Sequence, residues 1–285
     1  MKFRIIFALF AVMAWLNAGS AAADDENPFS VALSSKQIFE SDVNIQSGEI
    51  SISDTRFSFM HEFKLDNDLP IEWGINYKHL EIDENTATEI PSHLEGVQGK
   101  VGTKFPMPFV DSREMFMGVD VMPSMYTDDG SWTTSAFRMP FRVYGIYKES
   151  DELIFVAGVS IRPDFDQSVL PVIGLIYKPN DELAFNLASD NPTITYKVDD
   201  AKTVFLELDF TNDEYEVTQN GAKGRILKNR DFSTGAGLNY QITDLLKASV
   251  SGGVVFARRL QYEDPIGKLE PDAAGYVKAK VELSF

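Results

Sequence analysis

The C-terminal segment constrains the fold of this chain most. From Gly275 to Phe285, apolar residues alternate with Tyr, Lys, Glu and Ser. A period of two places one set of side chains on each face of a strand, and about ten residues are enough to cross a membrane in this conformation. The segment therefore predicts a membrane-spanning strand with one face in lipid and the other in water.

The N-terminal segment predicts export. A positive region that contains Lys2 precedes an apolar run of about a dozen residues, which is too short to cross a bilayer as a helix. Small residues follow, and Ala21 and Ala23 stand in the relation that a signal peptidase recognises. We expect residues 1–23 to be a cleaved signal peptide and residues 24–285 to form one domain.

An exported chain without an apolar helix has two main destinations, the periplasm and the outer membrane. The final strand favours the outer membrane, because a last strand that ends in Phe resembles the signal read by the barrel-assembly machinery. A soluble periplasmic β-protein remains the alternative. We expect the outer-membrane bilayer and the assembly machinery as partners, and the residues assigned to the signal are Tyr276, Val281, Leu283 and Phe285.

The same alternation recurs along most of the chain, and no long amphipathic helix is indicated. We predict an all-β fold, a single antiparallel up-and-down transmembrane β-barrel of about 14 strands, with 12 as the fallback because the strands near 182–199 are short. One strand is expected within Phe29–Ile52. The others are expected at residues 53–65, 71–82, 98–108, 115–126, 136–148, 152–162, 170–178, 182–190, 191–199, 203–211, 231–242, 247–262 and 274–285.

The connections between these strands alternate in length. Short links are expected on the periplasmic side and long links on the outer side, at 83–97, 127–135, 212–230 and 263–273. A tyrosine precedes four of the short acidic turns, as an aromatic girdle at one membrane interface requires. The predicted girdle residues are Tyr147, Tyr177, Tyr196 and Tyr240.

The segment from about Leu170 to Phe285 resembles an uncharacterised family of exported Gram-negative proteins, domain of unknown function 6268. This resemblance implies an outer-membrane β-barrel and no particular chemistry. The features that carry it are Leu170-Pro171 with Gly174, the turn Pro179-Asn180-Asp181, Asn191-Pro192 with Tyr196, and Arg259 with Glu263-Asp264.

Composition excludes several classes of function. The formal charge of −17 argues against nucleic acid as a partner. The chain has no cysteine, which removes disulfides and thiolate chemistry. Carboxylates in predicted loops could bind calcium weakly, but solvated turns are the preferred interpretation, and we predict no cofactor or metal site. These carboxylates are Asp164, Asp166, Asp213 and Glu214.

Three histidines limit the options for catalysis. His93 falls in a predicted outer loop, and His61 shares the parity of lipid-facing phenylalanines. His79 falls near the outer end of its strand, where an outer-leaflet lipid hydrolase could use it. A serine nucleophile is not paired with it in the sequence, so we predict an interfacial histidine and no enzyme.

Charges of both signs are predicted to face the lumen, and they indicate a passive or gated pore for small hydrophilic solutes. The first alternative is a transporter of hydrophobic compounds, with Asp24–Phe39 as a plug and an apolar inner wall near Phe116, Met122 and Ile146. A closed structural barrel and a lipid hydrolase follow. The principal lumen charges are Arg138, Arg142, Glu207, Asp209, Arg259, Lys278, Lys280 and Glu282, with Glu72, Asp120 and Lys247 beside them.

Overall fold

A computed structural model describes residues 28–285, except 45–47, 66–68, 87–89, 111–112, 129–132, 135, 189, 220–221 and 264–266. The predicted signal peptide therefore lies outside the described residues. No helix in the described part is long and apolar enough to span a membrane.

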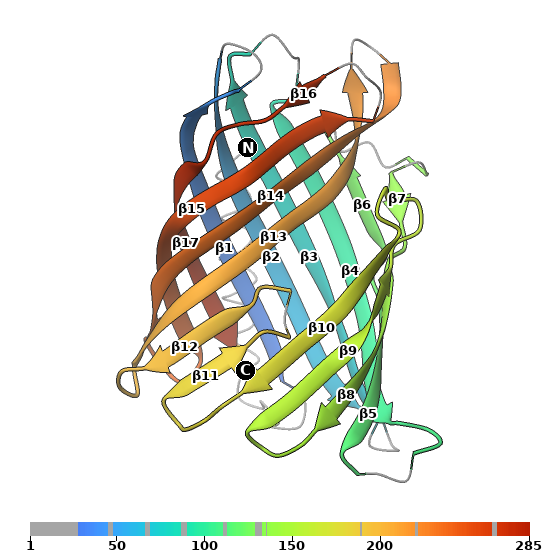
Figure 1. Ribbon diagram of the computed structural model, residues 1–285, viewed down its shortest axis with the longest axis vertical. Helices are drawn as coiled ribbons and strands as arrows, with labels where there is room; N and C mark the ends of the chain where they lie inside the picture. Colours follow the sequence, from blue (N-terminus) through green and yellow to red (C-terminus); the bar gives the residue numbers. More distant parts are fainter. Residues whose placement is uncertain are drawn as a thin grey trace, which may run out of the picture.

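The described chain forms a closed antiparallel β-barrel of 14 strands, which confirms the predicted fold class (Figure 1). The segments β5 and β6 make one barrel strand, as do β7 and β8, and β16 is a two-residue addition in a connection. The bounds are β1 (Phe29–Asp42), β2 (Glu49–Lys64), β3 (Pro70–Glu84), β4 (His93–Pro106), β5 (Met115–Val121), β6 (Ser124–Thr127), β7 (Phe137–Arg138), β8 (Phe141–Lys148), β9 (Leu153–Ile161), β10 (Val169–Tyr177), β11 (Leu183–Asn186), β12 (Thr193–Lys197), β13 (Lys202–Gln219), β14 (Ala222–Gln241), β15 (Leu246–Tyr262), β16 (Lys268–Leu269) and β17 (Ala274–Ser284).

The first strand closes the barrel. β1 pairs with β2 on one side and with β17 on the other, and the rings of Phe29 and Phe285 stack at 4.6 Å. We call this end of the barrel, where the connections are tight, the turn end, and the opposite end the loop end. The prediction that Asp24–Phe39 plugs the lumen is wrong for Phe29–Phe39, because these residues form wall strand β1.

The hairpin of β13 and β14 is longer than its sequence suggested. The predicted loop at 212–230 is wrong, since β13 and β14 stay paired from Lys202↔Tyr240 to Val217↔Arg225. The segment looked like a loop because it is rich in charged residues. Its inward positions include Tyr215 and Val217, which are fully buried, so burial at the loop end keeps the strands regular.

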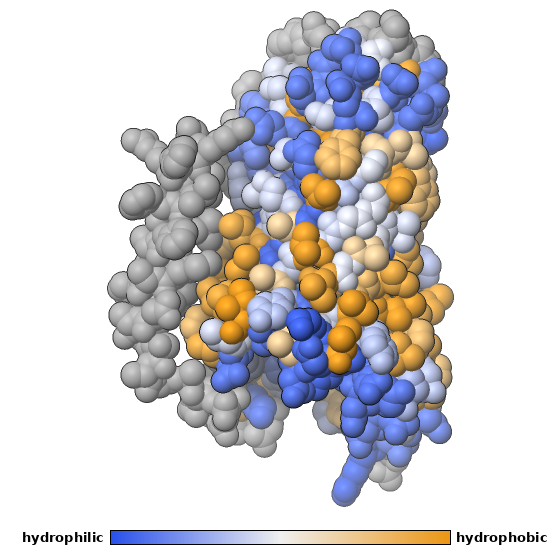
Figure 2. Space-filling model, turned by 90° about the vertical axis from the view of Figure 1, so that its left-hand side faces the viewer, coloured by the Kyte–Doolittle hydropathy of each residue, from blue (hydrophilic) through white to orange (hydrophobic). Residues whose placement is uncertain are grey.

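The outside of the barrel carries an apolar belt. Figure 2 shows orange side chains across the middle of the visible face and blue ones toward both ends. Phe210, Phe232 and Phe256 form a row of ring contacts at 4.6 and 6.1 Å on the outer face of β13–β15. The four predicted girdle tyrosines, 37–46 % exposed, lie toward the turn end: Tyr147, Tyr177, Tyr196 and Tyr240. This surface has the character of a membrane-spanning barrel.

A dry core fills the barrel at the loop end. The strands β1–β4 and β13–β15 bring apolar side chains from opposite walls into contact there. Burying these side chains removes them from water, which stabilises the closed loop end. We call this cluster the outer core, and its fully buried members are Ile50, Leu94, Tyr215, Val217, Leu227, Val255, Tyr262 and Leu269.

Candidate functional site

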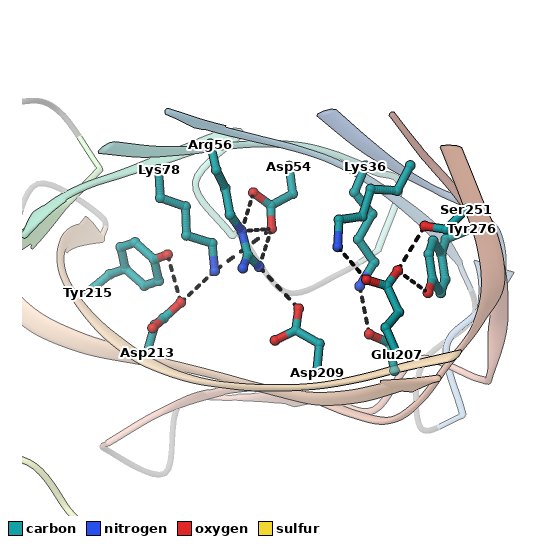
Figure 3. Close-up of polar contacts among 12 residues, drawn as sticks. Lys36, Asp54, Arg56, Lys78, Glu207, Asp209, Asp213, Tyr215, Ser251 and Tyr276 are labelled. Carbon is teal, nitrogen blue, oxygen red and sulfur yellow. Dashed lines mark hydrogen bonds and ion pairs between the residues drawn. The ribbon is translucent and has the colours of Figure 1, made fainter. Parts of the chain in front are cut away.

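A layer of charged side chains crosses the lumen directly beneath the outer core (Figure 3). Lys78 of β3 donates a hydrogen bond to Asp213 of β13 at 2.6 Å, and a guanidinium nitrogen of Arg56 of β2 lies 3.6 Å from Asp209 of β13. Asp54 pairs with Arg56 at 2.7 Å. Neither β2 nor β3 is a neighbour of β13 in the sheet, so these contacts join opposite walls. We call these five residues the ion-pair layer.

A second cluster continues the layer toward β17. Glu207 accepts hydrogen bonds from Lys278 at 2.8 Å, from Ser251 at 2.8 Å and from Tyr276 at 3.1 Å. Beside it, Lys36 donates to Ser233 at 2.9 Å. Because Glu207 is buried, these partners are needed to stabilise its charge.

The ion-pair layer spans the lumen at this height. The side chains of Asp54, Lys78 and Asp213 are only 7, 15 and 20 % exposed, respectively, and that of Arg56 is 35 % exposed. Attraction between opposite charges is strong where water is scarce, so the two walls are held together here. The outer core lies directly beyond the layer, and the two together seal this part of the lumen.

Two polar chambers lie between the ion-pair layer and the turn end. A cavity of about 520 Å³ is lined by the five residues of the ion-pair layer and by small polar residues that include Ser34, Ser58 and Asn76. A cavity of about 280 Å³ follows beside Asn239 and Ser249. Among the inward side chains of β17, exposure rises from 2 % for Tyr276 to 20 % for Lys278 and 36 % for Lys280, and it is 22 % for Glu282 near the turn end. The lumen is therefore more open toward the turn end than it is at Tyr276.

A third chamber has an aliphatic wall. This cavity of about 440 Å³ lies against the inner faces of β8, β9 and β10. Charged residues complete it on the other side, where Lys100 pairs with Glu72 at 2.6 Å and Arg142 with Asp120 at 3.2 Å. The aliphatic lining consists of Ile146, Ile154, Val156, Val172 and Ile176.

The connection between β11 and β12 separates the aliphatic chamber from the polar ones. Its Asp190 accepts a hydrogen bond from Arg142 at 2.6 Å and lines both the polar chamber of about 520 Å³ and the aliphatic chamber. Ala188 packs over the inner face of β10, since a Cβ placed on Gly174 would lie 2.4 Å from the Ala188 Cα. This close approach requires glycine at position 174.

With this geometry established, the sequence can be compared with known proteins. It matches the family described as a domain of unknown function, DUF6268, over residues 40–268. The chain belongs to the DUF6268 family. The match confirms the predicted resemblance and covers more than the segment from Leu170 that first indicated it.

No curated protein matches the chain. Among solved structures, this DUF6268 protein is similar to an outer membrane channel from Pseudomonas putida F1, with 10 % identity, 93 % of this chain and 100 % of the other covered, and a TM-score of 0.48. It is also similar to the P. putida toluene transporter TodX, with 10 % identity, 92 and 90 % covered, and a TM-score of 0.42. It is also similar to the KdgM porin, with 11 % identity, 90 % of this chain and 99 % of the porin covered, and a TM-score of 0.37.

The predicted lumen charges lie in different parts of the DUF6268 barrel. Glu207 and Lys278 meet in the second cluster, and Asp209 belongs to the ion-pair layer. Arg142 anchors the β11–β12 connection, whereas Arg138 is buried near the ring of Phe165, at 6.0 Å. Toward the turn end, Glu282 pairs with both Lys280 and Lys247, at 2.5 and 3.2 Å.

Arg259 does not point into the lumen. The backbone at Ala257 has a φ of 51°, and the register between β14 and β15 shifts at this bulge. The alternation therefore moves by one residue, so Arg258 is buried and Arg259 pairs with Glu270 on the outside at 2.9 Å.

The residues assigned to the assembly signal divide between the two faces of β17. Tyr276 points inward to Glu207, whereas Val281 is 41 % exposed on the outer face. Leu283 is half-buried, and Phe285 stacks on Phe29 at the barrel seam. Their role in assembly stays a prediction.

The histidines lie on or near the outer surface. His79 Nδ1 is 3.5 Å from Glu95, and His61 lies among the rings of Phe29, Phe63 and Trp73. His93 begins strand β4, which corrects its assignment to a loop.

Two of the four carboxylates that were expected in loops lie in a strand. Asp213 and Glu214 lie in β13 and not in a loop, and Asp213 is neutralised by Lys78. Asp166 in the β9–β10 loop pairs with Arg230 at 2.9 Å and with Lys228 at 3.3 Å. The hydrogen bonds from these cations lower the pKa of the Asp166 carboxyl. Asp164 lies in the same loop and has a φ of 65°. Among the described residues, no three His, Asp or Glu side chains are grouped to hold a metal ion.

Most of the ion-pair layer was missed from the sequence. Arg56 and Lys78 could have been found in their predicted strands, since Lys78 lies between Tyr77 and His79 and Arg56 precedes Phe57. Asp213 could not, because its segment was assigned to a loop. Strand parity predicts which side chains face the lumen. It does not predict how close the opposite walls lie, and this distance determines the contacts across the lumen.

Proposed function

We propose that this DUF6268 protein is an outer-membrane channel for small molecules and that the described conformation is its closed state. The ion-pair layer is the gate. In this proposal, residues 1–23 direct export, the assembly machinery reads the last strand, and the bilayer surrounds the apolar belt. Short turns face the periplasm in such barrels, so the turn end is periplasmic and the loop end is extracellular.

The observation that carries the proposal is the position of the ion pairs. They join opposite walls at the boundary between the open polar chambers and the outer core. A barrel that only had to be closed could continue the apolar packing of Leu94 and Tyr215 downward, because buried ion pairs offset their desolvation poorly and are often replaceable by apolar residues. Paired charges, in contrast, can separate and become hydrated, as a gate requires.

The chambers support passage of small solutes. Those lined by Ser34, Ser58, Asn76, Asn239 and Ser249 offer hydroxyl and amide groups and suit hydrophilic solutes. We propose no catalytic role for His79, which lies beside Glu95 on the outer face. A closed structural barrel is the second candidate, and it is favoured only by the outer core.

Planar-bilayer conductance of refolded residues 24–285 tests the gate. We expect brief, infrequent openings for the parent and frequent, cation-selective openings for Arg56→Ala/Lys78→Ala, because Asp54, Asp209 and Asp213 would then repel one another. Arg259→Ala is the matched control, since Arg259 pairs with Glu270 outside the lumen, and it should behave as the parent. A permanently open parent would disprove the gate. Correctly folded barrels that stay silent in all variants would support the structural candidate.

A further inference from the structure

The barrel wall is interrupted between β10 and β13, where Figure 1 shows the two strands diverging beyond the short β11 and β12. Among the described residues, the last hydrogen bond on this side of β10 is from the N–H of Leu187 to the carbonyl of Leu175, at 2.7 Å. Beyond it, β10 pairs only with β9, from Gly174 to Val169. In an antiparallel pair alternate residues direct their backbone groups away from the partner, so Ile173 and Pro171 face the interruption.

The facing edge of β13 is unpaired in the same way. The N–H of Leu208 donates to the carbonyl of Pro192 at 2.9 Å, and this is the last ladder bond toward β12. From Phe210 onward, β13 pairs with β14 on its other side, and among the described residues its next strand partner on the gap side is β6, at Glu216↔Thr127. Pro171 suits the opposite edge because it has no N–H to leave unsatisfied.

Two connections frame the interruption, which we call the lateral gap. The β11–β12 connection borders it toward the turn end. Toward the loop end, the β9–β10 loop crosses to β13: Arg162 donates to the carbonyl of Asn212 at 2.8 Å, Asn212 donates to Gln167 at 3.0 Å, and the N–H of Asp166 donates to Glu214 at 3.0 Å. Between these borders the edges run for about 13 Å along β13 and about 20 Å along β10, at about 3.3 Å per residue.

Both faces of the wall beside the lateral gap are apolar. Ile173 is 81 % exposed on the outside, against 41 % for Val159 on the fully paired β9, because no neighbouring strand flanks Ile173. On the inside, Val172 and Ile176 line the aliphatic chamber. Phe210, on the other edge, borders the polar chamber of about 520 Å³. Cavities inside the barrel therefore reach both edges of the lateral gap.

Unpaired backbone at this depth needs a source of hydrogen bonds. In the hydrocarbon layer an unsatisfied N–H or C=O group is strongly destabilising, and irregular backbone is tolerated where it borders a water-filled cavity. The described residues provide no strand partner for the backbone groups of Ile173 and Phe210 that face the lateral gap, so water from the chambers can hydrate them. The chambers and the lipid side of the wall therefore adjoin at the lateral gap.

We propose that the lateral gap is an opening through which apolar or amphipathic small molecules pass between the lipid and the aliphatic chamber. This proposal rests on the proposed channel function and adds a substrate class to it. The ion-pair layer and the outer core block the straight path to the loop end, whereas the lateral gap avoids both. The aliphatic wall receives the apolar part of the molecule, and the charged rim faces its polar part.

The acyl chains of the surrounding lipid are a direct probe of this opening. Brominated acyl chains quench tryptophan on contact. In residues 24–285, Trp73 and Trp132 are first replaced by Phe, and one tryptophan is then introduced at a time. Val172→Trp reports from the aliphatic chamber, Ile173→Trp from the lipid-facing side of the same strand, and Ser249→Trp from a polar chamber behind a fully paired wall.

We expect strong quenching of Ile173→Trp, at least half as much quenching of Val172→Trp, and at most one tenth as much quenching of Ser249→Trp. Val172→Trp that is quenched no more than Ser249→Trp would overturn the lateral opening, and conductance through the gate would be unaffected by that result. Each variant is first checked for heat-dependent gel mobility. Val156→Trp on β9 replaces Val172→Trp in the chamber if the latter does not fold.

Discussion

The two sides of this barrel are built differently. The strands β2, β13 and β14 contain 16, 18 and 20 residues, whereas β11 and β12 contain 4 and 5. The long strands continue past the apolar belt, and their inner faces meet in the outer core and the ion-pair layer. The short strands end within the wall beside the aliphatic chamber.

This difference means that one side of the barrel closes the lumen and the other side gives access to it. A strand that extends beyond the membrane can bury apolar side chains against the opposite wall, which makes the long-strand side rigid at the loop end. A strand that ends early leaves its neighbours with unpaired edges, as on β10 and β13. One side of the barrel therefore seals the lumen, and the other side opens it to the lipid.

Truncating the outer core should have the largest effect on stability. Leu94 is fully buried on the long-strand side, so Leu94→Ala should lower the free energy of unfolding by about 3 kcal/mol. Leu170→Ala, on the inner face of β10, should cost less than half as much because Leu170 is only half-buried. Denaturant unfolding of refolded barrels, followed by fluorescence, measures both. Equal losses of unfolding free energy in the two variants would contradict the difference between the two sides.

Breaking one contact of the ion-pair layer should have the next largest effect. Lys78→Met leaves the Asp213 carboxylate without its partner in a poorly hydrated position, which should cost about 2 kcal/mol. Lys78→Met/Asp213→Asn should recover most of this loss. A double-mutant cycle by denaturant unfolding measures the coupling, and strictly additive losses would contradict a direct interaction across the lumen.

Removing the Asp190 contact should increase the mobility of the β11–β12 connection and hardly change the stability of the barrel. Asp190 is 78 % exposed, so its pair with Arg142 contributes less than about 1 kcal/mol. Asp190→Asn should nevertheless increase the mobility of a spin label at Ala188→Cys, because it removes the contact that holds the connection inward. Asp200→Asn, which removes an exposed turn pair with Lys197, is the control and should leave the spectrum unchanged. An unaltered spectrum for Asp190→Asn would show that Arg142 does not hold the connection.

The smallest expected effect is a pH dependence of the mobility of the β9–β10 loop. Hydrogen bonds from Arg230 and Lys228 lower the pKa of Asp166 below its ordinary value of 3.8. A lowered pKa means that the tether is present above the ordinary value and is lost as the pH falls through the lowered one. A spin label at Ser168→Cys should gain mobility between about pH 5 and about pH 2. Asp166→Asn should make the label mobile at both pH values. A mobility change in acid that persists in this variant would exclude Asp166 as its source.

Much of the fold could be predicted because alternation and tight turns are local properties. The number of strands and the girdle tyrosines depend on a period of two and on short acidic turns, which the sequence displays directly. The segment 212–230 was mistaken for a loop because its charged residues are satisfied by distant partners such as Lys78. The inward direction of Arg258 depends on a bulge at Ala257 that no glycine or proline marks. The ion-pair layer and the lateral gap depend on contacts between strands far apart in the sequence.

Accessibility of a single thiol tests the central claim, that the lumen is open at the turn end and sealed at the loop end. The chain has no cysteine, so Ser249→Cys places one thiol in a polar chamber and Asp164→Cys places a control thiol in the β9–β10 loop. In proteoliposomes of one orientation, a charged, membrane-impermeant thiol reagent should modify Ser249→Cys only from the turn end and Asp164→Cys only from the loop end. Modification of Ser249→Cys from the loop end at a comparable rate would contradict the account.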